Sequence, residues 1–233
     1  MYIKITSRCN MHCDHCCFSC TTNGEDMSLD TFRNALNFYA LKYTKANLTI
    51  GGGEPTLHKC FHSIILRAVN LKIFDSEKNL KIPDIVTNGS IPEQAFYLLN
   101  LARQKKLIVA LSLDKYHDPI APEVEKAFKL AEKHSDFIQI KNVESHQVVG
   151  VGRAAKWAIP PSYCLYNGPT IEPNGDIRYC GCENAFIVGN VNTGLRNEEM
   201  YIICKREAAC GRKLEKWKRH QLEKISQSYV NVV

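Results

Sequence analysis

Four cysteines fall within nine consecutive positions of the segment "SRCNMHCDHCC" (7–17), at Cys9, Cys13, Cys16 and Cys17. Such a cluster could form disulfides, bind zinc or hold an iron–sulfur cluster. The chain has 11 cysteines in 233 residues, an odd number, and its start "MYIKITSR" lacks the basic and long apolar regions of a signal peptide. We therefore expect a cytoplasmic protein with reduced thiols, in which metal or cluster ligation is favoured over disulfides.

The spacing of Cys9, Cys13 and Cys16 is CxxxCxxC. Three thiolates on one loop can hold three corners of a cubane and leave the fourth iron open for a small molecule, much as catalytic zinc keeps an open position. Zinc remains an alternative, because Cys13 and Cys16 form a CxxC pair with His15 alongside. Cys17 fits no ligand position, and we interpret it as a bystander thiol.

Strand-like and helix-like segments alternate around this loop. The expected strands are 2–6, 46–50, 84–87, 107–113 and 137–140, with "HQVVG" (146–150) as a candidate for one more. The expected helices are 28–43, 60–70, 92–104 and 122–134, with Ser28 as an N-cap and proline opening the last two. Alternation of this kind predicts a parallel sheet covered by helices, either open or curled into a barrel.

Polar loops follow four of the expected strands. They are the cysteine loop, "GGGEP" (51–55), "NGS" (88–90) and "DKYHDP" (114–119). Each alone could be only a turn or a flexible loop. Because the loops after parallel strands lie at one end of the sheet, their coincidence predicts a functional site there.

CxxxCxxC after the first strand, with "GGGEP" after the second, resembles the radical S-adenosylmethionine (AdoMet) superfamily. The resemblance implies a partial (β/α)6 barrel. We expect the barrel to be shortened, because the chain between 134 and "GRA" has room for one or two strands but for no further full helix. It implies that Cys9, Cys13 and Cys16 hold a 4Fe–4S cluster whose open iron chelates the amino and carboxylate groups of AdoMet. Reductive cleavage of AdoMet then gives a 5′-deoxyadenosyl radical that abstracts hydrogen from a substrate.

The resemblance also assigns the AdoMet contacts. Gly52, Gly53 and Glu54 match the segment that receives the amino group of AdoMet, since glycine permits close approach and a carboxylate accepts from an ammonium. His15 stands where the family usually has an aromatic residue near the adenine. The strand-end positions that touch the ribose or methionine parts correspond to Asn88, Ser112 and Asp114.

A second pattern begins at "GRA" (152–154), within a glycine- and proline-containing passage (150–164) that we interpret as a linker. Cys164, Gly175 and Cys180 match the opening of the SPASM and twitch extensions, whose β-hairpin holds an auxiliary cluster, and "PNG" (173–175) predicts the hairpin turn. The resemblance implies one auxiliary 4Fe–4S cluster, with a zinc ribbon as the alternative. Its expected ligands are Cys164, Cys180, Cys204 and Cys210, with Cys182 in reserve.

These observations predict two domains, a barrel at 1–150 and a hairpin-plus-helix cluster-binding region at 151–233. The predicted function is a radical AdoMet oxidoreductase or maturase that acts on a small molecule, peptide or nucleotide and takes electrons from a flavodoxin or ferredoxin. The alternatives are an activating enzyme for glycyl radicals and a zinc protein that binds nucleic acid. The net charge of +6, concentrated near the C-terminus, permits nucleic-acid binding, but a solvated helix face is favoured. No apolar run reaches membrane-spanning length.

Overall fold

The computed structural model describes residues 1–44, 46–74, 80–144, 147–159, 169–178, 185 and 187–195. The strands in these ranges are β1 (Tyr2–Thr6), β2 (Thr49–Gly52), β3 (Asp84–Thr87), β4 (Ile108–Ser112), β5 (Ile138–Lys141), β6 (Thr170–Ile171), β7 (Asp176–Arg178), β8 (Ile187–Asn190) and β9 (Gly194–Leu195). The helices are α1 (Leu29–Lys42), α2 (Phe61–Val69), α3 (Pro92–Arg103) and α4 (Pro122–Glu132), with 3-10 helices η1 (Pro55–Leu57) and η3 (Gly152–Lys156).

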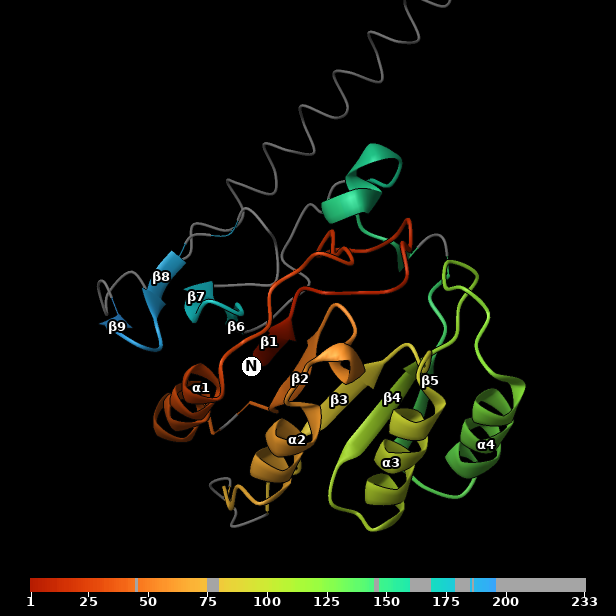
Figure 1. Ribbon diagram of the computed structural model, residues 1–233, viewed down its shortest axis with the longest axis horizontal. Helices are drawn as coiled ribbons and strands as arrows, with labels where there is room; N and C mark the ends of the chain where they lie inside the picture. The colour runs from red at the N-terminus through yellow and green to blue at the C-terminus, as the bar shows by residue number, and fades with distance from the viewer. Residues whose placement is uncertain are drawn as a thin grey trace, which may run out of the picture.

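The described strands form one mixed sheet in the order β5-β4-β3-β2-β1-β6-β7-β8-β9 (Figure 1). Neighbours from β5 to β6 pair in parallel, and β6 to β9 pair antiparallel. The expected α/β fold with a parallel-rich sheet is therefore confirmed. The carboxyl ends of β1 to β4 point to the same edge, where the cysteine loop crosses above them.

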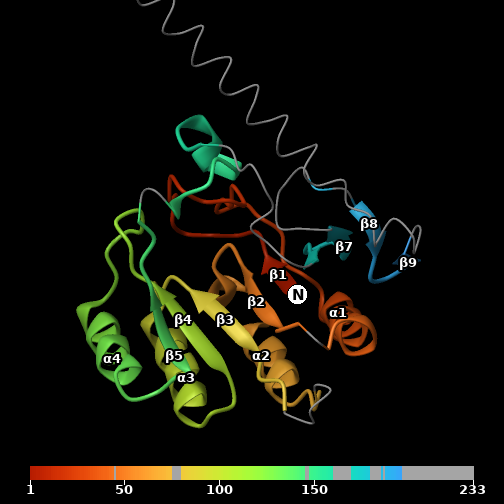
Figure 2. The same cartoon turned by 180° about the vertical axis from the view of Figure 1, so that it is seen from behind.

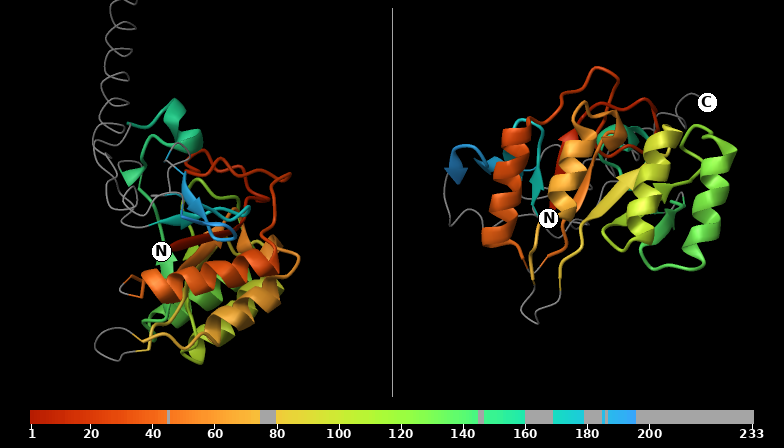
Figure 3. Two further views of the ribbon diagram at one scale, coloured as in Figure 1. Left: turned by 90° about the vertical axis from the view of Figure 1, so that its left-hand side faces the viewer. Right: turned by 60° about the horizontal axis from the view of Figure 1, so that its bottom comes forward.

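The four α-helices cover one face of the sheet, as Figure 2 and Figure 3 show from behind and from the side. Their bounds agree closely with the predicted ones because the local signals are strong. The Ser28 side chain accepts a hydrogen bond from the Thr31 amide, 3.0 Å away, and proline opens α3 and α4 as predicted. The helices and strands bury a continuous apolar core that includes Ile3, Ile5, Phe32, Ile50, Ile64, Ile85, Leu98, Val109 and Phe128.

The predicted hairpin is also present as β6 and β7. Gly175 has φ +90°, a conformation that favours glycine, and the Asn174 side chain accepts from the Asp176 amide. The hairpin extends the sheet, because β6 pairs with β1 and Lys4 forms an ion pair with Glu172 at 3.2 Å.

Three sequence-based expectations were wrong in detail. The second strand begins at Thr49 rather than at Ala46, because Ala46 and Asn47 instead accept hydrogen bonds from the Tyr39 hydroxyl and the N-terminal ammonium. Residues 147–150 form no strand in the part that the structure describes. The passage around "GRA" is no simple linker, because 152–156 form η3 and pack on the cysteine loop.

No helix within the described ranges is long and apolar enough to cross a membrane.

Candidate active site

A cavity of about 340 Å³ lies at the carboxyl ends of the strands. Among its lining residues are most of those that the sequence singled out: Cys9, Cys13, His15, Cys16, Gly52, Gly53, Glu54, Asn88 and Ser112. The structure thus brings the cysteine loop and the three other loops together, as predicted. Asp114 lies just outside this lining, and its neighbour His117 reaches the cavity instead.

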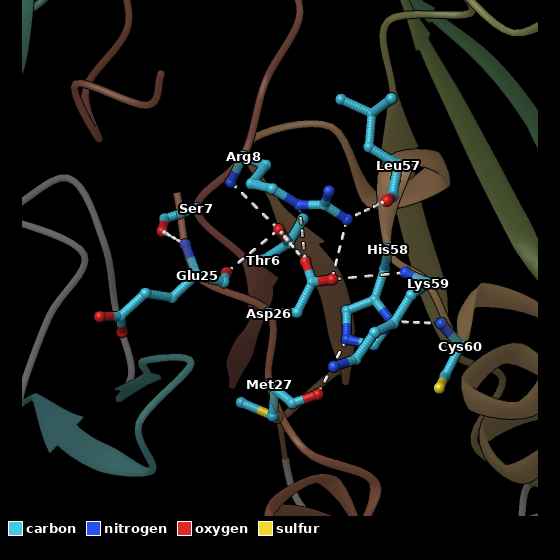
Figure 4. A network of polar contacts seen from close by, with 10 residues as sticks. All are labelled: Thr6, Ser7, Arg8, Glu25, Asp26, Met27, Leu57, His58, Lys59 and Cys60. Carbon is cyan, nitrogen blue, oxygen red and sulfur yellow. Dashed lines mark hydrogen bonds and ion pairs between the residues drawn. The ribbon is translucent and has the colours of Figure 1, made fainter. Parts of the chain in front are cut away.

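The two ends of the cysteine loop are joined by a network of polar contacts (Figure 4). Arg8 donates to both carboxylate oxygens of Asp26, at 3.1 and 2.8 Å, and the Thr6 hydroxyl donates to the same carboxylate at 2.7 Å. The Ser7 amide also donates to the Glu25 carbonyl at 2.8 Å, and the Glu25 amide donates to the Ser7 hydroxyl at 2.7 Å. A bidentate arginine–carboxylate pair has a defined geometry, so the base of the loop is fixed before any cofactor binds.

We expect Asp26→Ala to destabilise the protein by about 1.5–3 kcal/mol, the usual cost of losing hydrogen bonds to a charged group. Urea unfolding measures this free energy. The matched control is Asp30→Ala, because Asp30 makes an exposed pair with Arg33 and surface pairs contribute roughly 0–1 kcal/mol. Equal effects of the two substitutions would contradict the role given to Asp26.

The same carboxylate gives a pH dependence. Burial alone would raise the pKa of Asp26, but hydrogen bonds from Thr6 and Arg8 lead the opposing influences, and the net pKa lies below its usual 3.8. A depressed pKa means that the stabilisation is present above the usual value and is lost as pH falls through the lower, folded-state value. The difference in unfolding free energy between wild type and Asp26→Asn should therefore shrink below about pH 4.

The glycines of "GGGEP" are required by the packing of the chain itself. Gly52 has φ +147°, and a Cβ atom there would lie 2.1 Å from the Thr6 carbonyl oxygen. At Gly53 a Cβ atom would lie 2.0 Å from the Arg8 carbonyl oxygen. The amides of Gly53 and Glu54 donate to these carbonyls, both at 2.8 Å. The segment therefore holds the start of the cysteine loop as well as lining the cavity.

Glu54 is a fully buried carboxylate at the end of this segment. One oxygen accepts from the amide and hydroxyl of Thr56 and from the hydroxyl of Thr87, at 3.1, 2.6 and 2.7 Å, and the other accepts from the Asn88 amide at 2.7 Å. Burial is the largest influence and raises the pKa of Glu54, although these hydrogen bonds oppose it. A buried carboxylate beside a cavity favours a cationic partner, such as an ammonium group.

The thiols of Cys9, Cys13 and Cys16 lie close enough to affect one another. Burial raises the pKa of Cys9 and raises that of Cys13 to about 12, with the neighbouring thiols adding to the effect at Cys13. A hydrogen bond from Cys20 is the main reason that the pKa of Cys16 falls to about 5. Bound metal ions would deprotonate such thiols, so the donor set fits a metal cluster.

His15, Asp114 and His117 form a second polar group beside the cavity, and their ligand atoms all lie within 4.8 Å of one another. Asp114 accepts from the His117 ring nitrogen Nδ1 at 2.8 Å, and His15 stacks on Tyr116 with ring centroids 4.6 Å apart. Burial lowers the pKa of His15, so its ring is neutral at pH 7. Asp114 Oδ2 lies 3.6 Å from His15 Nε2. His15 Nδ1 and Asp114 Oδ2 are buried and make no hydrogen bond among the described residues.

Sequence reasoning missed several residues of this site. Tyr116 and His117 lie in the "DKYHDP" loop, which we singled out only for its first residue. Arg153 donates to the carbonyls of Cys13 and Cys20, and Trp157 stacks on Tyr116. The "GRA" signature was the available signal for Arg153, but only the fold shows what the arginine contacts. The predicted auxiliary ligands Cys164, Cys180, Cys182, Cys204 and Cys210 lie outside the described residues.

A parallel-rich α/β sheet with three grouped thiols at its strand ends is the arrangement expected of a protein that binds a cofactor at the carboxyl edge of the sheet. The family model of the radical SAM superfamily matches residues 3–140. The chain therefore belongs to the radical SAM superfamily, whose members are enzymes. AdoMet and a 4Fe–4S cluster are the cofactors expected for the family.

Among curated proteins, the chain is similar to YydG from Bacillus subtilis (strain 168), whose name assigns it to peptide biosynthesis. The two are 27% identical over 122 residues, which are 50% of this chain and 36% of YydG. The alignment thus spans about a third of the length of that relative.

Two solved structures share the fold. BtrN in complex with AdoMet and 2-DOIA has a TM-score of 0.56 and 14% identity, over 94% of this chain and 88% of that one. Native anSMEcpe with bound AdoMet and the Cp18Cys peptide has a TM-score of 0.52 and 17% identity, over 89% of this chain and 81% of that one. At these identities the similarity shows the fold alone.

Proposed function

We propose that the chain cleaves AdoMet reductively and uses the resulting radical to abstract hydrogen from a peptide substrate. The observation that carries the proposal is the single cavity that unites Cys9, Cys13 and Cys16 with the three loops after β2, β3 and β4. The cluster, when bound, supplies one electron for cleavage of the sulfonium. The residues of the chain hold the cluster, orient AdoMet and exclude water.

The three cysteines would hold the cluster, and the residues around them would hold AdoMet. Glu54 is proposed to receive the amino group, because its carboxylate is buried at the cavity wall. His15 is proposed to lie against the adenine, since its neutral ring already stacks on Tyr116. Asn88 and Ser112 line the same cavity, where polar groups can bind the ribose and methionine parts. Asp114 would act through His15 and His117, which both line the cavity and contact its carboxylate.

A peptide substrate is favoured by two relatives. YydG is named for peptide biosynthesis, and anSMEcpe is seen with a bound peptide. A small molecule is the second candidate, because BtrN is seen with 2-DOIA and its fold covers more of this chain. To distinguish the two candidates, the reduced protein is incubated anaerobically with peptide libraries and, separately, with 2-DOIA, and the products are analysed by mass spectrometry. We expect a substrate-dependent mass change in the peptide arm alone.

The proposal includes a second 4Fe–4S cluster held by the C-terminal cysteines and a cytoplasmic flavodoxin or ferredoxin as the electron donor. The support for the second cluster is the spacing of Cys164, Gly175 and Cys180, together with the observed hairpin turn at Gly175. Such a cluster would take an electron from the substrate radical or help to bind the substrate. The region would correspond to a twitch-type extension of residues 151–233.

We expect Glu54→Gln to weaken AdoMet binding roughly ten- to a hundredfold, because a lost charged hydrogen bond costs about 1.5–3 kcal/mol. Iron content should stay unchanged. Calorimetry on the anaerobic, cluster-loaded protein measures the affinity.

The matched control is Thr56→Val. It removes the hydrogen bond from the Thr56 hydroxyl to the Glu54 carboxylate, and Thr56 itself is not among the lining residues. AdoMet affinity should change by less than about threefold in this variant. An equal loss of affinity in both variants would show that Glu54 acts only through the fold.

A further inference from the structure

The 3-10 helix η3 lies over the cysteine loop, although more than 130 residues separate the two segments along the chain (Figure 1). Arg153 makes three hydrogen bonds to this loop. Its amide donates to the Cys16 carbonyl at 2.9 Å, its Nε to the Cys13 carbonyl at 2.9 Å, and its Nη1 to the Cys20 carbonyl at 2.7 Å. A single arginine therefore spans the part of the loop that carries two of the three proposed cluster ligands.

The contact between the two segments is close on both sides of Arg153. Gly152 has φ +55°, and a Cβ atom there would lie 2.4 Å from the Cys16 carbonyl oxygen. On the other side, Trp157 Nε1 donates to the Asp14 carbonyl at 3.3 Å. These contacts fix where η3 sits on the loop, so the position of the guanidinium is set by the fold rather than by a flexible side chain alone.

The guanidinium also brings a positive charge to the cavity wall. Arg153 lines the cavity, and its Nη2 is buried without a partner among the described residues. The same guanidinium is held against the carbonyls of Cys13 and Cys20, so its charge lies beside the loop that carries the thiols.

We propose that Arg153 is a positioning residue for the cluster held by Cys9, Cys13 and Cys16, and that its charge favours the reduced state of that cluster. This inference rests on the proposed function. The hydrogen bonds of Arg153 hold the cysteine loop in the conformation that binds the cluster, and this slows the loss of iron. Reduction adds one electron to the cluster, and a fixed positive charge nearby in a partly buried site stabilises the added negative charge.

The test compares three variants of the full, reconstituted chain. Arg153→Lys keeps the charge but loses the planar fork that reaches two carbonyls. Arg153→Gln loses the charge as well. Lys156→Gln is the matched control, because Lys156 is an exposed cation of the same helix. The measurements are the rate of iron release to a chelator and the midpoint potential from an anaerobic redox titration followed by electron paramagnetic resonance (EPR).

We expect both Arg153 variants to release iron at least about tenfold faster than wild type. Only Arg153→Gln should shift the reduction equilibrium about tenfold toward the oxidised state, a fall of about 59 mV for one electron. Lys156→Gln should match wild type in both measurements. Wild-type iron release in Arg153→Gln would overturn the positioning role, and a wild-type potential in that variant would overturn the electrostatic one.

The relevant EPR signal is the part that disappears when Cys9, Cys13 and Cys16 are replaced together. If wild type shows no such signal, the proposed function fails, and the inference about Arg153 fails with it. If the signal is present and the Arg153 variants behave as wild type, the proposed function stands and only the inference is overturned.

Discussion

Replacing Cys9, Cys13 and Cys16 together by alanine is expected to abolish AdoMet cleavage. These three thiols carry the spacing of the cluster loop and line one cavity with the proposed AdoMet residues. Without them no open iron is available to bind and reduce AdoMet. The measurement is the amount of 5′-deoxyadenosine that dithionite-reduced protein forms under anaerobic conditions, and it should fall below detection.

The fold should survive this change, because the base of the loop is closed by Arg8 and Asp26 rather than by the thiols. Iron content should fall from about eight to about four per chain if a second cubane is present. Cys17→Ala is the matched control, since Cys17 lines the same cavity but has no ligand spacing. Undiminished 5′-deoxyadenosine from the triple variant would refute the assignment of the catalytic cluster.

The second large effect is expected for the double replacement of Cys164 and Cys180 by alanine. If the two cysteines hold an auxiliary 4Fe–4S cluster, about four of eight irons should be lost. Substrate turnover should cease, because the cluster that accepts an electron from the substrate radical, or that helps to bind the substrate, would be missing. Uncoupled AdoMet cleavage should persist, since the loop at Cys9, Cys13 and Cys16 is untouched.

Metal analysis and product analysis on the same anaerobic samples test this prediction. Cys60→Ala is a suitable control, because Cys60 lies at the start of α2 and belongs to neither cysteine pattern. It should leave the iron content unchanged. Four irons and one zinc per wild-type chain would contradict the auxiliary cluster and would make the C-terminal region a structural zinc module.

Much of the fold could be predicted because its signals are local. Ser28 caps α1 with its own side chain, proline opens α3 and α4, and short apolar runs form the buried strands. Since the loops of parallel strands meet at one edge, the gathering of the cysteines with Gly53 and Ser112 also followed from the order of the elements.

The remaining features depend on contacts between distant parts of the chain. Nothing near Arg153 in sequence indicates that it reaches the carbonyl of Cys13, 140 residues away. The pairing of β6 with β1 also joins residues that are far apart in the sequence. The glycines beside Glu54 differ from these cases. Their residue type correctly indicated a close approach, but the groups that approach them are the Thr6 and Arg8 carbonyls of the chain itself. A pattern of residue types does not say which neighbour requires them.

The most direct test of the central claim is an EPR experiment on the reduced protein with AdoMet labelled with ¹⁵N in its amino group. If the cluster at Cys9, Cys13 and Cys16 binds AdoMet through an open iron, the cluster signal should show hyperfine coupling to the label. The coupling should vanish in the triple alanine variant. A cluster signal that is unaffected by labelled AdoMet at saturating concentration would contradict the account.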